Sequence, residues 1–293
     1  MDHVLTLIAG AGTTLEPALA AAIRRTIGGG PETVLSPGEA AEIACSGPPD
    51  LGRARALLEA RPIDAVVTPA AGRRKRLLVA DMDSTIVADE TLDELAAHAG
   101  MKEPIAAITR QSMNGEVAFA DALRRRVAML RGLDCGALAA TWRAVRIAPG
   151  ARELVATMRA HGATTVLVSG GFTYFTSRVA EALGFDIHHA NTLLDDGTAL
   201  TGAVAEPVLD RDAKRDALRA IAASKRLDRA ETIAVGDGAN DLDMLQEAGL
   251  GIAYHAKPIV AAAIPARIDH ADLRALLFVQ GYRAAEFRSS GSG

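Results

Sequence analysis

The chain has 293 residues, of which 49% are hydrophobic and 3% aromatic, and a formal net charge of −4. This length accommodates one large domain or two smaller ones around an aliphatic core, and the charge balance excludes the basic footprint of nucleic-acid or anionic-membrane binding. No apolar run reaches the roughly 18 residues of a membrane span, and the first residues lack the basic segment of a signal peptide, so we expect a cytoplasmic protein with reduced cysteines.

Residues 1–70 carry the pattern of a small α+β domain. Apolar alternation and turn signals predict, in order, strand His3–Ile8, helix Leu15–Ile27, strands Glu32–Leu35 and Ala40–Cys45, helix Leu51–Ala60 and strand Ile63–Val67. This β-α-β-β-α-β order is the ferredoxin-like pattern. Residues 71–76 are the expected linker, in which the basic run at 73–76 is best explained as a solvated face.

From residue 77 to about 285, strands alternate with helices. The predicted strands are Leu77–Asp81, Thr164–Val168, Thr232–Val235, Gly251–Tyr254 and Arg267–Asp269, and the helices between them include Ala151–His161 and Thr173–Leu183. This alternation predicts a doubly wound, Rossmann-like α/β domain with a parallel sheet. Residues 88–145 lack a strand pattern, so we expect a helical cap over the carboxyl edge, and the Ser/Gly-rich segment 286–293 predicts a flexible tail.

Two carboxylates follow the first predicted strand of this domain. Asp81 ends the apolar run that begins at Leu77, and Asp83 comes two residues later. Residues two apart on a strand point the same way, so these carboxylates would crowd each other. A chain tolerates such crowding where a cation binds or where a carboxylate must react.

Other polar residues follow the next strands, at the same edge of the sheet. Ser169, Gly170 and Gly171 follow the second strand, Asp237, Asn240 and Asp241 follow the third, and Lys214 lies on a helix between them. Several carboxylates with no nearby His or Cys suit Mg²⁺. A lysine, a hydroxyl and glycine amides around one carboxylate describe a phosphoryl-transfer site. That carboxylate can itself attack phosphorus and form an aspartyl-phosphate.

The ordered motifs resemble those of a known family. Asp81-Met82-Asp83-Ser84-Thr85, then Ser169, Lys214 and Gly236-Asp237-Gly238-Ala239-Asn240-Asp241, are similar to the four motifs of the haloacid dehalogenase-like phosphatases. Within that family, Glu90, Met113, Phe119, Arg126 and the run Ser169–Phe172 resemble the bacterial phosphoserine phosphatases. The resemblance covers roughly residues 75–285, and residues 1–70 are similar to an ACT-like domain.

The resemblance implies hydrolysis of O-phospho-L-serine to serine and phosphate, the last step of serine biosynthesis. It makes Asp81 the nucleophile and Asp83 the acid and base. It assigns Mg²⁺ to the carboxylates of Asp81 and Asp237 and to the backbone carbonyl of Asp83, with Asp241 supporting these ligands. The residues implied to contact the substrate are Ser169, Gly170, Gly171, Lys214, Asn240, Glu90, Met113, Phe119 and Arg126.

The substrate residues have a physical rationale and open alternatives. Glu90 suits the substrate ammonium and Arg126 its carboxylate, and Phe119 shares a helix face with Arg126 because they are seven residues apart. Alternatively, Glu90 caps the next helix, Arg126 belongs to a solvated charged helix, and Met113 lies in the core.

Two other functions are compatible with the same sequence. One is a related phosphatase or a phosphotransferase that uses another small phosphomonoester. The other is an amino-acid sensor, in which residues 1–70 bind the ligand and the phosphatase half is secondary. We expect a small-molecule substrate and no nucleic-acid or membrane partner, and the sequence leaves a homo-oligomer open.

Overall fold

The N-terminal unit is a four-stranded antiparallel sheet with two helices on one face. The structure, a computed structural model, describes residues 1–59, 61–113 and 116–289. The elements of this unit are β1 (His3–Ala9), α1 (Pro17–Thr26), β2 (Glu32–Ser36), β3 (Ala40–Cys45), α2 (Leu51–Leu58) and β4 (Ile63–Pro69). Their order in the sheet is β2-β3-β1-β4, and each pair is antiparallel. The predicted ferredoxin-like topology is therefore confirmed.

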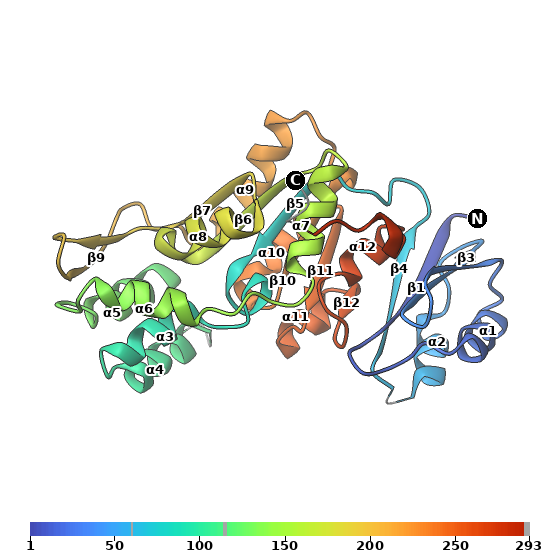
Figure 1. Cartoon of the computed structure of the whole chain (residues 1–293), viewed down its shortest axis with the longest axis horizontal. Coiled ribbons are helices and arrows are strands. Elements are labelled where there is room, and N and C mark those ends of the chain that lie inside the picture. The colour runs from blue at the N-terminus through green and yellow to red at the C-terminus, as the bar shows by residue number, and fades with distance from the viewer. Residues whose placement is uncertain (60, 114–115, 290–293) are drawn as a thin grey trace.

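The larger part of the chain is built on a six-stranded parallel sheet (Figure 1). Its strands are β5 (Leu77–Asp81), β6 (Thr164–Phe172), β7 (Ile187–Asn191), β10 (Thr232–Gly236), β11 (Leu250–Tyr254) and β12 (Arg267–Ile268), in the order β12-β11-β10-β5-β6-β7. Helices α7 (Ala151–Ala160), α8 (Thr173–Leu183) and α12 (Ala275–Val279) cover one face, and α9 (Arg211–Ser224), α10 (Leu242–Glu247) and α11 (Pro258–Ala263) cover the other.

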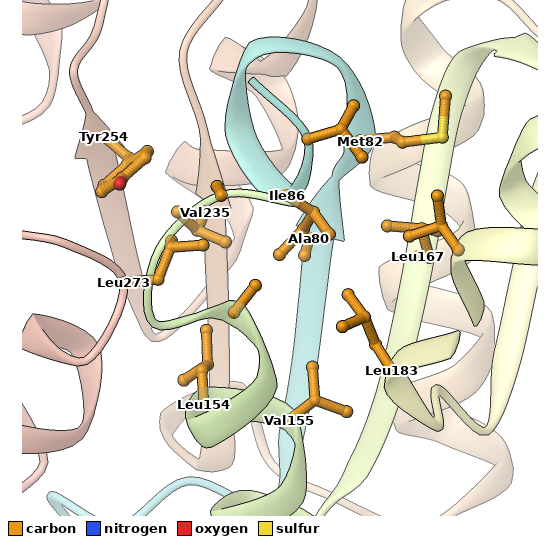
Figure 2. Close-up of a cluster of buried hydrophobic side chains, with 14 of the residues drawn as sticks. Ala80, Met82, Ile86, Leu154, Val155, Leu167, Leu183, Val235, Tyr254 and Leu273 are labelled. Carbon is orange, nitrogen blue, oxygen red and sulfur yellow. The ribbon is translucent and has the colours of Figure 1, made fainter. Parts of the chain in front are cut away.

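The central strand β5 shows why this sheet forms. All five of its residues are buried, with Leu78 and Ala80 in the apolar cluster under α7 and α8, and Leu77 and Val79 in the cluster under α9 and α10. Figure 2 shows the first of these clusters, in which Ala80 lies on one face of the sheet near Leu167 and Val235 of the neighbouring strands and the aliphatic side chains of α7 and α8. A strand buried on both faces is apolar throughout, so the predicted doubly wound α/β domain is confirmed.

A cap lies at the end of the molecule away from the N-terminal unit (Figure 1). It contains α3 (Thr91–His98), α4 (Lys102–Met113), α5 (Phe119–Ala128) and α6 (Gly136–Ala144). These helices form the helical insertion that the sequence predicted. The hairpin β8 (Leu193–Asp195) and β9 (Leu200–Val204) packs against α5, and Arg124 of the cap forms an ion pair with Glu206 after the hairpin at 2.8 Å. Strand β7 and this hairpin were not predicted from the sequence, although Asp196-Gly197 between apolar runs is a hairpin signal.

The other face of the N-terminal sheet docks on the parallel-sheet domain. Ile8 and Val66 belong to the same buried cluster as Leu276 of α12. Arg73 is only 11% exposed in its side chain and pairs with Glu42 at 2.6 Å. The expectation of a solvated basic run is therefore wrong for Arg73, because its guanidinium neutralises a carboxylate within the interface.

The segment after residue 285 is partly anchored. Phe287 packs on Phe278 with ring centroids 5.0 Å apart, and the Arg288 N–H donates to Thr157 Oγ1 at 2.8 Å. The expected flexible tail therefore does not begin at 286, and residues 290–293 lie outside the described residues. Both cysteines are free. Among the described helices, none is long and apolar enough to cross a membrane.

Candidate active site

The centre of the site is a buried lysine between two aspartates. Asp81 ends β5, Lys214 lies on the first turn of α9, and Asp241 follows β10, and none of the three is more than 4% exposed. Lys214 Nζ donates to the carboxylates of Asp81 and, at 2.7 Å, of Asp241. Burial alone would lower the pKa of Lys214, but Asp241 and Asp81 raise it above its usual value. The lysine is therefore a fixed positive charge.

Three carboxylates converge beside this lysine. Asp81, Asp237 and Asp241 each offer a side-chain oxygen, and these oxygens lie within 4.8 Å of one another. Burial raises the pKa of Asp237 to about 6, although Lys257, whose ammonium lies 3.4 Å from it, opposes the shift. Burial and the neighbouring Asp241 also raise the pKa of Asp81. Buried oxygen ligands with excess negative charge fit a hard divalent cation.

Asp83 points away from this carboxylate cluster. Its Oδ1 accepts hydrogen bonds from the Thr91 N–H at 2.8 Å and the Thr91 hydroxyl at 2.7 Å, and its Oδ2 accepts one from Ser169 Oγ at 2.9 Å. Burial and then Glu90 raise the pKa of Asp83 to about 6, although these hydrogen bonds oppose the shift. A carboxyl group with this pKa can donate or accept a proton near neutrality.

The last residues of β6 form one wall of the site. The Gly171 N–H donates to Ser169 Oγ at 2.8 Å, and the Gly170 carbonyl accepts a hydrogen bond from Asn191 Nδ2 at 3.0 Å. A Cβ on Gly170 would lie 2.9 Å from Phe119 Cζ, so the cap ring closely covers this end of the strand. The structure thus brings Phe119 to the wall that carries Ser169.

Arg126 is a buried cation in the cap whose guanidinium has only neutral hydrogen-bond partners among the described residues. It is 9% exposed, and its guanidinium donates to the Ala122 carbonyl and to Thr109 Oγ1, both at 3.3 Å. Burial lowers its pKa, while Asp93 and Glu90 act in the opposite direction. Among the described residues, no carboxylate lies within ion-pair distance of this guanidinium. An interpretation as a solvated charged helix is therefore wrong for Arg126.

The other three predicted substrate residues, Glu90, Asn240 and Met113, have fewer described contacts within the site. Glu90 is exposed, occupies the N-cap position of α3 without capping it, and accepts a hydrogen bond from Ser84 Oγ at 2.8 Å. Asn240 is half-buried near Gly238, whose Cβ position would lie 2.4 Å from Asn240 Oδ1. Met113 ends α4, and its side chain lies outside the described part of the chain.

Sequence reasoning missed three residues that contact this site. Thr91 holds Asp83, Lys257 lies beside Asp237, and Asn191 holds Gly170 and also accepts a hydrogen bond from the Leu209 N–H at 2.7 Å. Thr91 had a signal, because it opens a helix directly after Glu90. Asn191 and Lys257 had none, because their partners are distant in the chain.

The fold and the site define a class of hydrolase. The family model of the haloacid dehalogenase-like hydrolases matches residues 78–246, so the chain belongs to this family. A phosphoserine phosphatase of Streptomyces coelicolor is 41% identical over 227 residues, which are 77% of this chain and 55% of that protein. A phosphoserine phosphatase of Lactococcus lactis is 42% identical, over 69% of this chain and 94% of that protein.

One solved structure extends the similarity to the N-terminal unit. A HAD family hydrolase from Salmonella enterica serovar Typhi superimposes with a TM-score of 0.84 and 29% identity, over 94% of this chain and 98% of that chain. In contrast, this chain spans about half the length of the relatives from Streptomyces coelicolor and Mycobacterium tuberculosis.

Proposed function

We propose that this protein hydrolyses O-phospho-L-serine to L-serine and phosphate in the cytoplasm, through an aspartyl-phosphate on Asp81. The observation that carries the proposal is the placement of Asp81 against Lys214, with Asp83 nearby at a pKa of about 6. The names of the relatives from Streptomyces coelicolor and Lactococcus lactis support the substrate.

In the first half of the proposed reaction, a carboxylate oxygen of Asp81 attacks phosphorus and the bond to the serine oxygen breaks. Asp83, in its protonated form, donates its proton to that leaving oxygen. Lys214, Ser169 and the amides of Gly170 and Gly171 hold the phosphoryl oxygens, where negative charge develops in the transition state. The cap ring of Phe119 excludes water from the leaving group.

In the second half, Asp83 accepts a proton from a water molecule that attacks the aspartyl-phosphate. This attack releases phosphate and restores Asp81. The carboxylates of Asp81 and Asp237 and the backbone carbonyl of Asp83 would hold Mg²⁺, while Asp241 keeps Lys214 in place. When bound, Mg²⁺ neutralises charge on the phosphoryl group.

The decisive experiment is phosphate release from a panel of phosphomonoesters, with and without Mg²⁺. We expect O-phospho-L-serine to have the highest kcat/KM, and activity to disappear after chelation. A panel in which another phosphomonoester is clearly preferred would contradict the substrate. Added homoserine should leave phosphate as the product, and formation of a phosphorylated alcohol would instead indicate a phosphotransferase.

Arg126→Ala should weaken recognition of phosphoserine selectively. A charged hydrogen-bonded pair contributes about 1.5–3 kcal/mol, so we expect kcat/KM for phosphoserine to fall about 10- to 100-fold. Turnover of p-nitrophenyl phosphate, which has no carboxylate, should change less than about threefold. Arg125→Ala, an exposed change on the same helix, is the matched control. Equal losses on both substrates would remove Arg126 from substrate recognition.

Mg²⁺ binding should weaken as the pH falls through about 6. Because burial raises the pKa of Asp237 to about 6, protons compete with the cation below that pH. In the metal-free protein, the stabilising contribution of this raised pKa is present below about pH 4 and is lost as pH rises through 6. The apparent Mg²⁺ affinity should drop about tenfold from pH 8 to pH 5.

This pH dependence can be measured as the Mg²⁺-induced rise in Tm at pH 5, 6 and 8. Asp237→Asn, which cannot bind the proton, is the control and should show a weak and flatter response. An unchanged Mg²⁺ response between pH 5 and 8 in the wild-type protein would contradict the role of Asp237.

A further inference from the structure

One of the contacts between the N-terminal unit and the larger domain is made by a buried carboxylate. Asp64 lies on β4 and is 4% exposed. It accepts hydrogen bonds from three successive backbone N–H groups, those of Asp269 at 2.8 Å, His270 at 3.2 Å and Ala271 at 2.8 Å. Hydrogen bonds to a charged acceptor are about twice as strong as neutral ones. Asp64 therefore fixes the loop 269–271 after β12.

The same loop contacts the segment that ends beside the site. The Ala271 carbonyl accepts a hydrogen bond from His255 Nε2 at 3.0 Å, which places the proton on that nitrogen. Two residues further on, the Lys257 N–H donates to the Asp237 carbonyl at 2.9 Å, and Lys257 Nζ lies 3.4 Å from Asp237 Oδ2. Loop 269–271 and the segment 255–257 thus join Asp64 to Asp237.

His255 adopts a backbone conformation that needs support. Its φ is +43°, a region that non-glycine residues rarely occupy. The His255 N–H donates to the Ile268 carbonyl at 2.8 Å, and its ring donates to Ala271, so both bonds come from β12 and the loop after it. A residue stays in a strained conformation only where several contacts hold it there. Disorder in loop 269–271 would therefore change the backbone conformation of residues 255–257.

A second contact leads from this region to the base of the cap. The Leu273 N–H donates to the Pro149 carbonyl at 3.1 Å. Pro149 lies on the segment that returns from the cap, where the Ala148 N–H donates to the Ile86 carbonyl at 2.9 Å. The loop that Asp64 holds is therefore next to the point where the chain enters and leaves the cap.

We propose that Asp64 is a positioning residue, through which the N-terminal unit orients Asp237 for Mg²⁺ by way of loop 269–271, His255 and Lys257. The proposal rests on the proposed function only in assigning Asp237 to the cation. The N-terminal unit then supports the cation site without contacting the substrate, because the bonds that order the Asp237 loop continue into β4.

The test is to substitute Asp64→Asn, which keeps the shape but turns an amide group toward backbone donors. We expect the Mg²⁺ concentration that gives half of the maximal Tm rise to increase about 3- to 10-fold, a smaller effect than loss of a direct partner of a ligand. The kcat at saturating Mg²⁺ should stay close to that of the wild type. His255→Phe, which keeps a ring and removes its hydrogen bond to Ala271, should shift the Mg²⁺ requirement in the same direction, although the bonds that Asp64 accepts are retained.

Glu42→Gln is the matched control, because it breaks the buried interface pair with Arg73 and leaves loop 269–271 untouched. We expect it to lower Tm while its Mg²⁺ requirement stays within about twofold of the wild type. The proposal is overturned if Asp64→Asn and His255→Phe leave the Mg²⁺ requirement unchanged, or if Glu42→Gln shifts it equally. Because the Tm readout needs no substrate, this result is separate from failure to hydrolyse phosphoserine.

Discussion

Asp81→Asn should abolish phosphoserine turnover, with a loss of at least about 10⁴-fold in kcat, because an amide cannot attack phosphorus and form the aspartyl-phosphate. The fold should persist, since the substitution removes one of the buried carboxylates that repel one another. Burial and Asp241 raise the pKa of Asp81, so in metal-free buffer at pH 8 the variant should melt at the same temperature as the wild type or slightly higher.

Phosphate release and thermal denaturation measure the two parts of this expectation. Asp216→Asn, at an exposed aspartate on α9, is the control and should leave both unchanged. Activity of Asp81→Asn within about tenfold of the wild type would rule out the covalent mechanism, even if the protein still preferred phosphoserine.

Lys214→Met should have the second largest effect, because it removes the ammonium that compensates Asp81 and Asp241. We expect a loss of at least about 10³-fold in kcat, since in the proposed reaction this lysine also holds the phosphoryl oxygens. Breaking a buried pair by removing one partner costs about 3 kcal/mol or more, so Tm should fall in the metal-free protein.

The stability of Lys214→Met should also depend on pH in a defined direction. Lys214 lowers the pKa values of Asp81 and Asp237, which burial raises. Without the lysine these two pKa values rise further, so the variant should be more stable at pH 5 than at pH 8. Lys225→Met, an exposed change just after the same helix, is the control. A Tm of Lys214→Met equal to that of the wild type at pH 8 would show that the lysine is not needed to balance this cluster.

The polar motifs of the site could be predicted because each one is local. Asp81, Ser169 and Asp237 all lie at or just after the carboxyl ends of parallel strands, and such ends meet at one edge of a sheet. The apolar runs before them predicted the strands, since a strand buried on both faces is apolar throughout. The sequence therefore indicated which residues would meet at this edge of the sheet.

The orientation of individual side chains could not be predicted from these local patterns. The sequence placed Asp83 beside Asp81, yet its carboxylate points to Thr91 and Ser169. It left open that Glu90 caps α3, whereas the first N–H of that helix donates to Asp83. Hydrogen-bond donors that arrive from other segments decide these orientations, and no local pattern encodes them.

The sequence by itself determined the N-terminal α+β unit, the α/β domain and the family, and it indicated the reacting groups that we propose, because periodicity and motif order can be read from consecutive residues. Only the tertiary structure decided that Asn191 supports the end of β6 at Gly170, that Arg73 is buried in an interface, and that Asp64 reaches the loop next to His255. These contacts join residues far apart in the chain, and they form only when the packing of the two units brings donors and acceptors together where water is excluded.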